Sequence, residues 1–230
     1  MPIGVLTDCA AVALGGIIGT LAGKRIPRET REQLTVIFGF CAMGIGINSI
    51  IKASSMTPVI LAVILGSLLG SLWDLEGKIQ GMTSAALKRL PLRGETDLNQ
   101  LMIVIVLFCF SGFGYYGTFL SSMSGDHSVL ISKAMLDAFT AMIFAISVGI
   151  PVTLVSLPML AIMLALFLVG KLIAPLMSEG MMKDFIACGG ILTLVTGVRV
   201  SRILHTRVIN MIPALILVLP LSWLWSLLPF

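Results

Sequence analysis

The sequence contains few charged side chains. Of its 230 residues, 15 are Lys or Arg and 11 are Asp or Glu, whereas 57% are hydrophobic. A water-soluble globule of this length needs many more charged side chains to cover its surface, but a surface that faces lipid needs none. The composition therefore excludes a soluble domain and indicates an integral membrane protein whose partner is the lipid bilayer.

Cysteine is also scarce, and the cysteines form no C-x-x-C pair. Cys9, Cys41, Cys109 and Cys188 all lie within apolar stretches. This pattern indicates neither a disulfide framework nor a cysteine-ligated metal site. We expect all four to be small reduced core residues, and the identity of any metal bound elsewhere stays open.

Sequence motifs of known enzymes and nucleotide sites are missing. There is no H-E-x-x-H, G-x-S-x-G or P-loop motif, and His127 and His205 have no paired ligands nearby. We therefore expect no enzymatic activity, no cofactor and no ATP hydrolysis by this chain. The net charge of +4 comes from basic residues in short segments between apolar runs, where they set topology, so nucleic acid is not an expected partner.

Basic residues are absent from the first segment, MPIGVLTD. A cleaved signal peptide has a positively charged region there, followed by an apolar run and a small-residue cleavage site. We therefore expect the first apolar run to remain as a membrane span.

Eight apolar runs are long enough to cross a bilayer as helices. They lie at residues 4–23, 34–51, 57–73, 98–120, 131–154, 157–176, 183–199 and 208–228. The sequence thus predicts an all-α, polytopic transmembrane bundle in a single domain, residues 1–230. The boundary between the fifth and sixth runs is the weakest, and we assign its turn to Pro151, Ser156 and Pro158.

Most Lys and Arg residues fall on one side of this predicted topology. The odd-numbered loops hold Lys24, Arg25, Arg28, Arg31, Lys78, Lys88, Arg89, Arg93, Arg199, Arg202 and Arg207, whereas the other side holds Lys52, Lys133, Lys171 and Lys183. By the positive-inside rule, this bias predicts that both termini lie outside the cytoplasm. In the long third loop, residues 78–90 predict a short helix in the membrane interface, with a partly ordered loop as the alternative.

Two pairs of segments have similar sequences. LGGIIGTL at residues 14–21 and LGSLLGSL at residues 65–72 each contain G-x-x-x-G, and F-C-x-x-G-x-G occurs at residues 40–46 and again at 108–114. We interpret these matches as a parallel duplication of a two-helix hairpin. Repeat unit one spans about 4–51 and unit two about 57–120, and the remaining helices span 131–228.

The glycines of these and later segments are expected to let helix backbones approach closely in lipid. The predicted packing positions are Gly15, Gly19, Gly66, Gly70, Gly44, Gly112, Gly189 and Gly190. Bundles with internal repeats often hold a substrate site near the membrane midplane, where helices are short or broken. The seventh predicted span is short and rich in glycine.

Ionisable side chains inside spans are costly in lipid, so each is a candidate functional residue. Asp137 lies inside the fifth span with Thr140 on the same helix face, and such oxygens suit a hard cation or a proton. The alternative is a structural ion pair with Lys133, whose side chain would extend outward to the interface.

Two further residues support this candidate site. Asp8 lies at a similar depth in the first span, where the two carboxylates would form a cation entrance, although Asp8 could instead cap that helix. Asn48 can hydrogen-bond to a neighbouring helix. In the last span, Asn210 is placed to satisfy carbonyls that Pro213 leaves free.

The segment GDHSVLISKAMLDAFTAMIFAISVG resembles the YqgA/YdfK-like family of bacterial inner-membrane proteins, a family built on a domain of unknown function. The matching residues are Gly125, Asp126, His127, Leu130, Lys133, Leu136, Asp137, Phe139, Thr140, Gly189, Gly190, Asn210 and Pro213. The resemblance extends nearly end to end and implies a multi-pass inner-membrane transporter or channel, without a substrate or catalytic set. Arg199 departs from it, since similar proteins tend to carry asparagine there, and the resemblance therefore assigns no site to the seventh span.

These observations favour a membrane transporter or channel for a cation or small solute, not driven by ATP in its own chain. The candidate ion-binding residues are Asp137, Thr140, Asp8 and Asn48. Because a chain of 230 residues leaves little room for a wide enclosed path, a homo-oligomer is also expected. The alternative is a structural or regulatory membrane protein, such as an assembly factor or sensor, with no transport activity.

Overall fold

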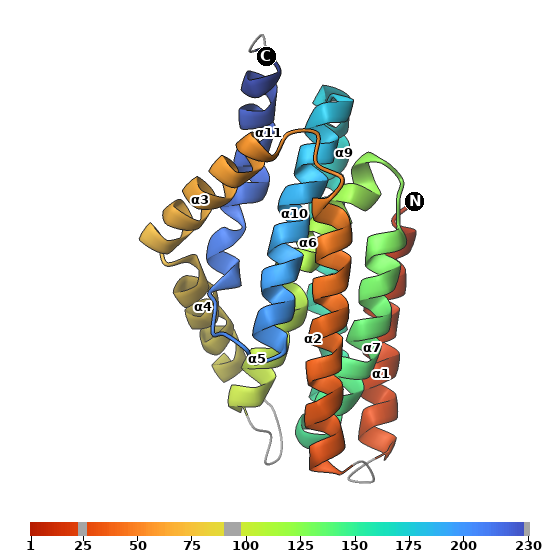
Figure 1. The fold of residues 1–230 in the computed structure, drawn as a ribbon. Coiled ribbons are helices and arrows are strands. Elements are labelled where there is room, and N and C mark those ends of the chain that lie inside the picture. Colours follow the sequence, from red (N-terminus) through yellow and green to blue (C-terminus); the bar gives the residue numbers. More distant parts are fainter. Residues whose placement is uncertain (23–26, 90–97, 228–230) are drawn as a thin grey trace.

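The structure is a computed structural model that describes residues 1–22, 27–89 and 98–227. Regular secondary structure in these ranges is entirely helical (Figure 1). Seven helices in the described ranges are long and apolar enough to cross a membrane, or eight if the bent pair α3 and α4 forms one span. The predicted all-α bundle of about eight spans is therefore confirmed. Some predicted positions lie outside the described residues. These are the ends of two predicted spans, residues 23 and 228, and the basic residues Lys24, Arg25 and Arg93.

The helices follow one another with short connections. Their bounds are α1 Ile3–Ala22, α2 Arg28–Ile50, α3 Met56–Leu72, α4 Leu75–Arg89, α5 Leu98–Cys109, α6 Gly112–Met123, α7 Ser128–Val148, α8 Pro151–Leu154, α9 Ser156–Ile173, α10 Glu179–Val200 and α11 Pro213–Ser226. There are also two 3₁₀ turns: η2, Ala174–Leu176, follows α9, and η3, Val208–Met211, precedes α11. The N-terminus and the end of α11 lie at the same end of the bundle (Figure 1).

Three helix pairs form the longest contacts, and glycines set their spacing. Along α1 and α7, Gly15 faces the backbone of Ala138 and Gly19 that of Met142, so these two helices run in the same direction. Between α2 and α10, Gly46 faces Gly190, and a Cβ on either would lie 2.7–2.8 Å from the other's carbonyl oxygen. Such close backbone approach is what small residues permit in lipid.

The third pair, α3 and α11, has Gly66 against Ala214 and Gly70 against Asn210. Two other predicted packing glycines face side chains, Gly112 against Leu192 and Gly189 against the ring of Tyr116. Gly44 differs from the prediction, because nothing in the described structure lies within 4 Å of a Cβ placed there. It lies on a different face of α2 from Gly46 and is not a packing position.

The buried apolar residues form two separate clusters. One joins residues of α1, α5, α7, α8 and α9, such as Val12, Phe108 and Met159. The other joins α2, α3, α6, α10 and α11, such as Val59, Phe185 and Val218, and includes Val129 from the first turn of α7. The bundle is thus packed as two groups of helices, and α6 contacts both α9 and α10.

The breaks in the spans differ from those expected. The seventh span is not short, since α10 continues for 22 residues. A break instead interrupts the fourth span at Phe110 and Ser111, between α5 and α6. The helix predicted at residues 78–90 is present as α4, which follows α3 at a bend of 49° and packs against α5 and η3. Its location in the membrane interface stays a prediction. Apolar composition alone carries no signal for these positions.

The turn between the fifth and sixth spans also lies earlier than predicted. Helix α7 ends at Val148 because Gly149 has a φ of 82°, a left-handed conformation that glycine adopts without a steric penalty. Pro151 then starts the short α8, and Pro158 fits into the first turn of α9.

The proposed duplication of a hairpin stays a prediction. The two F-C-x-x-G-x-G segments differ in local structure, because the first lies inside the continuous α2 and the second crosses the break between α5 and α6. In addition, α1 has its main contact with α7 and α2 with α10, rather than with each other.

Candidate ion-binding site

A buried cluster joins α1 and α7 through three ionisable side chains. The Nζ of Lys133 donates hydrogen bonds to Oδ2 of Asp8, at 2.8 Å, and to Oδ2 of Asp137, one helical turn further along α7. The exposed fractions of the side chains are 0% for Asp8, 2% for Lys133 and 14% for Asp137. The two carboxylates that sequence analysis selected are thus held together by one ammonium group.

This cluster has an unbalanced charge when all three groups are ionised. One ammonium neutralises one of the two carboxylates, and two like charges close together in a buried site disfavour each other's ionised form. The second oxygen of Asp8, Oδ1, is buried and has no hydrogen-bond partner among the described residues. A buried carboxylate oxygen without a donor is costly, so the site is chemically suited to take up a proton or a small cation.

Of the structural alternatives for these residues, only the ion pair between Lys133 and Asp137 is present. Lys133 does not extend to the interface, because it is buried and bridges two helices. Asp8 does not cap α1, because it lies inside the helix and pairs with Lys133. From the sequence we expected the two acids to form a cation entrance and Lys133 to pair with Asp137 alone, whereas the structure joins all three side chains in one cluster.

The broken fourth span makes room for the lysine. A Cβ on Gly114, in the first turn of α6, would lie 3.1 Å from Cε of Lys133 and 3.0 Å from Oγ of Ser111. Ser111 caps α6 by accepting a hydrogen bond from the amide of Gly114, at 2.9 Å. The helix break thus places a polar cap beside the buried lysine.

A small cavity of about 50 Å³ lies next to the cluster. Lys133, Asp137, Ser111, Thr140 and Thr196 all line it. This volume is enough for a water molecule or a small cation. Thr140, the second predicted site residue, therefore lies beside Asp137 at the cavity wall.

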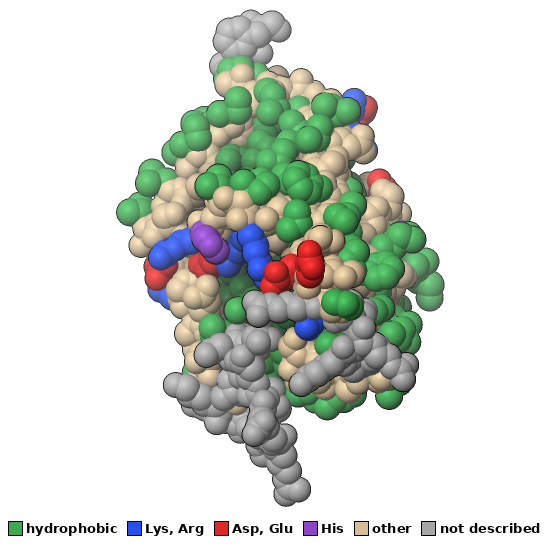
Figure 2. Space-filling view, turned by 60° about the horizontal axis from the view of Figure 1, so that its bottom comes forward, with side chains coloured by type: hydrophobic (Ala, Val, Ile, Leu, Met, Phe, Trp, Pro, Cys, Tyr) green, Lys and Arg blue, Asp and Glu red, His purple; other side chains and the backbone are tan. Residues whose placement is uncertain are grey.

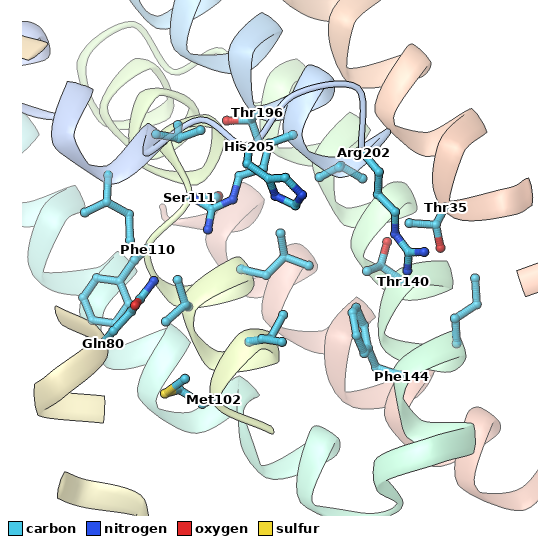
Figure 3. Close-up of a pocket in the computed structure, with 18 of the residues that line it drawn as sticks. Thr35, Gln80, Met102, Phe110, Ser111, Thr140, Phe144, Thr196, Arg202 and His205 are labelled. Carbon is cyan, nitrogen blue, oxygen red and sulfur yellow. The ribbon is translucent and has the colours of Figure 1, made fainter. Parts of the chain in front are cut away.

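A second cavity of about 760 Å³ shares part of this wall (Figure 3). Ser111, Thr140 and Thr196 line both cavities, and the larger one continues past Met102 and Phe144 to residues at the helix ends opposite the termini. Its walls come from α2, α4, α5, α7 and α10, so it lies between the two groups of packed helices. Ser111, Thr140 and Thr196 thus lie between the larger cavity and the small cavity beside the buried cluster.

The wide end of this cavity is basic. Arg31, Arg199, Arg202 and His205 line it, with Glu32 as the acidic residue among the described lining side chains. Figure 2 shows charged side chains and a histidine gathered in one band on this part of the molecule, next to a mostly hydrophobic surface. From the sequence, Arg31 and Arg202 were used only to assign topology.

Arg199 connects this cavity to the bent span. Its Nη2 lies 2.9 Å from Oε1 of the buried Glu76, near the start of α4. Oδ1 of Asn210 accepts a hydrogen bond from the amide of Glu76 at 2.9 Å, so the Asn210 side chain supports α4. The sequence had suggested a different role, in which Asn210 satisfies carbonyls that Pro213 leaves free. The bend between α3 and α4 is thereby fastened to α10 and η3.

Other polar residues lie away from the ion cluster. Asn48 is exposed on α2 and lines neither cavity, and Ser49 instead bonds to the hydroxyl of Tyr116, at 3.3 Å. Asp184, which sequence analysis missed, is buried and accepts hydrogen bonds from the amides of Ser54 and Ser55 and from Ser222. These bonds satisfy Asp184 and give it a structural role.

Cysteine and histidine form no metal centre in the part of the chain that the structure describes, where no group of three His, Cys, Asp or Glu side chains could hold a metal ion. Cys9, Cys109 and Cys188 are buried, but Cys41 is exposed on α2, contrary to the expectation that all four are core residues.

Comparison with known proteins places the chain in a family. Residues 3–223 match the family described as "Protein of unknown function (DUF554)". The chain belongs to this family. It is 42% identical over 234 residues to YqgA of Escherichia coli K12, described as an uncharacterized protein, with 98% of each chain covered. It is 24% identical over 218 residues to YdfK of Bacillus subtilis 168, described as an uncharacterized membrane protein, with 93% of each covered.

No solved structure matches the chain. The sequence matches to YqgA and YdfK confirm the family resemblance that the segment around Asp137 predicted. Membership of the DUF554 family assigns no substrate and no functional residues, so these must be inferred from the geometry described above.

Proposed function

We propose that this protein is a bacterial inner-membrane transporter or channel that moves a proton or small cation through the Asp8–Lys133–Asp137 cluster. A cluster of ionisable side chains inside membrane helices is expensive to maintain, and such clusters commonly mark ion pathways. The family similarity to a protein described as a membrane protein supports the location, and the apolar helices support a multi-pass topology.

One observation carries this proposal, the excess carboxylate in the buried cluster. Two carboxylates share the single ammonium of Lys133, and Oδ1 of Asp8 has no donor among the described residues. A purely structural ion pair needs one acid for one base, and its polar atoms are normally satisfied. The additional acid is explained if a proton or cation occupies the cluster during part of a transport cycle.

The cavities support access from one side. The larger cavity reaches the polar residues Ser111, Thr140 and Thr196, beyond which lie Lys133 and Asp137. Because this path lies between two separately packed groups of helices, a rocking motion of one group against the other would expose the cluster to the opposite side. We assign the wide end to the cytoplasm on the basis of the positive-inside rule.

This function needs no cofactor and no catalytic step. The chain has no nucleotide-binding motif, so a gradient of the transported ion or of a second solute would drive any accumulation. Residues of a single chain line the open cavity of about 760 Å³, so a path does not require a second copy, although a homo-oligomer remains part of the proposal.

Ion flux into liposomes tests the proposal. Purified protein is reconstituted, and uptake of H⁺, Na⁺ and K⁺ is measured separately for the native chain and for Asp137→Asn. We expect native flux of one of these ions and a fall to background in the variant, because the excess negative charge is removed. Thermal unfolding in detergent checks that the variant is folded.

Glu179→Gln is the matched control, since Glu179 is an exposed carboxylate that pairs with Lys183. It should conduct like the native protein. The proposal would be contradicted if every ion entered three kinds of liposome at the same rate: those with native protein, those with Asp137→Asn and those without protein. This result would favour the structural or regulatory alternative.

A further inference from the structure

The charge of the wide cavity is opposite to what a simple cation path requires. Its described lining contains three arginines and His205, against the single acid Glu32, and Arg199 is neutralised by Glu76. A basic mouth lowers the local concentration of cations and raises that of anions. Cation uptake by the buried cluster therefore does not explain this part of the molecule.

Arg202 is an exposed residue that lines the cavity and has a backbone conformation unfavourable for arginine. It has a φ of 59°, and the amides of Arg202 and Ile203 bond to the carbonyls of Arg199 and Val198, at 3.0 and 3.2 Å. This pair of bonds is the Schellman motif at the end of α10, whose left-handed position is usually glycine. Non-glycine residues in strained conformations cluster at functional sites, and Figure 3 shows the Arg202 side chain pointing into the cavity.

A second arginine in the cavity is partly unsatisfied. Nη1 of Arg31 donates a hydrogen bond to Oγ of Ser147 at 3.0 Å, but its buried Nε has no partner among the described residues. Guanidinium groups bind carboxylates through two parallel N–H donors. Arg31 and Arg202 thus supply the donors that an anion in this cavity would need.

The rest of the cavity wall is apolar. Met102, Phe110 and Phe144 line it together with aliphatic side chains of α5 and α7. The volume of about 760 Å³ is within the range of small-molecule sites, in which a few polar groups orient a ligand against apolar walls. An inorganic anion would leave this apolar surface without contact, whereas an acid with an apolar body would cover it.

We propose that the cavity binds a small organic acid, with its carboxylate on Arg31 and Arg202 and its apolar body against Met102, Phe110 and Phe144. The role of this acid as cargo rests on the proposed function, since a proton or cation on the buried cluster would then accompany it. Ser111, Thr140 and Thr196 separate the two sites, so a negative charge in the cavity favours a positive charge at the cluster.

Binding of radiolabelled benzoate to the purified protein tests the acid site without any need for transport. Equilibrium dialysis in detergent should show saturable binding that unlabelled benzoate displaces, and benzylamine and inorganic phosphate should displace it poorly. In Arg202→Gly the Kd for benzoate should rise about tenfold or more, the cost of losing a charge-assisted hydrogen bond.

The same variant separates a binding role from a structural one. Glycine is the favoured residue at this left-handed position, so the Tm of Arg202→Gly should equal or exceed that of the native protein. Arg207→Gln is the control, because Arg207 is exposed on the same connection and pairs with Asp74 outside the cavity. It should bind benzoate like the native protein.

Three results would overturn the organic-acid site. The first is that the native protein shows no saturable benzoate binding, and the second is that Arg202→Gly binds benzoate as tightly as the native protein. The third is that the native protein binds benzoate in phosphatidylcholine nanodiscs and loses this binding in nanodiscs that contain phosphatidylglycerol. The last result would assign the arginines to an anionic lipid head group. Benzoate binding without any ion flux would instead contradict the transport proposal alone, and Asp137→Asn should keep benzoate binding while it loses flux.

Discussion

At the scale of single residues, Lys133 determines whether the ion cluster can exist. Its ammonium is almost completely buried and is the base that contacts both Asp8 and Asp137. Breaking a buried ion pair is costly because the remaining charge has lost both water and its partner. Here the loss would leave two carboxylates beside each other.

We predict that Lys133→Met lowers the free energy of unfolding by about 3–5 kcal/mol, as expected for the loss of one partner of a buried pair. The measurement is unfolding by sodium dodecyl sulfate in mixed micelles. Addition of Asp8→Asn to this variant should restore part of the loss, because one uncompensated carboxylate is removed.

The control for this prediction is Lys183→Met. Lys183 also pairs with an acid one turn away, Glu179, but both side chains are solvent-exposed. Exposed pairs contribute little, so the variant should unfold like the native protein. Equal losses for Lys133→Met and Lys183→Met would show that the buried cluster is not strongly coupled.

At the scale of helices, the bundle depends on backbone contacts that only glycine allows. A Cβ on Gly19 would overlap the carbonyl oxygen of Met142, and one on Gly70 would overlap that of Asn210. Gly44 also lies inside a long helix and belongs to the other repeated motif, F-C-x-x-G-x-G, but its surroundings are open. The same substitution at these positions therefore has different consequences.

Gly19→Ala and Gly70→Ala should each destabilise the protein by about 1–3 kcal/mol, because the added methyl forces the paired helices apart. Gly44→Ala should be neutral or stabilising by up to about 1 kcal/mol, since alanine favours a helix and meets no neighbour. Thermal unfolding of the three variants in one detergent gives the comparison. A loss at Gly44 as large as at Gly19 would mean that α2 packs differently.

The element scale also shows where sequence reasoning stops. The apolar run at 98–120 is continuous in hydropathy, yet it breaks at Ser111, which caps α6 and lies beside Lys133. Serine inside a membrane run can donate to its own helix, cap a new one or face a cavity, and its neighbours in space decide among these. The positive φ of Gly149 is likewise visible only in the structure.

At the scale of the whole molecule, the N-terminus and the end of α11 lie at one end of the bundle, and the start of α2, which contributes Arg31 to the basic cavity, lies toward the other (Figure 1). By the positive-inside rule, we predict that the basic end faces the cytoplasm. In the proposed function, the side from which an ion approaches the buried cluster depends on this orientation, because Ser111, Thr140 and Thr196 line both the basic cavity and the small cavity beside the cluster.

Accessibility of single cysteines tests the orientation. In a chain whose native cysteines are replaced, Ser124→Cys lies in the exposed turn between α6 and α7, and Arg207→Cys lies in the exposed connection between α10 and α11. A membrane-impermeant maleimide should label Ser124→Cys in intact bacterial spheroplasts and Arg207→Cys only after lysis. The reverse pattern would place the basic cavity outside the cytoplasm.

Much of the fold was predictable because membrane spans depend on local composition. A run of apolar residues must form a helix in lipid, since its backbone polar groups have no other partner there. The candidate site was predictable in part, because an acid within such a run is rare and therefore noticeable. The exposed position of Asn48 and the open surroundings of Gly44 were not, since the face that a helix turns inward depends on its neighbours.

By itself, the sequence determined that the chain forms a helical membrane bundle, which residues span it, and that Asp8 and Asp137 are unusual within it. Only the tertiary structure decided that these two acids, far apart in the chain, share Lys133, and that Ser111 and Arg202 face one cavity leading toward them. The physical reason is that apolarity is a property of each segment, whereas the charge balance of a buried site is a property of side chains that meet through packing.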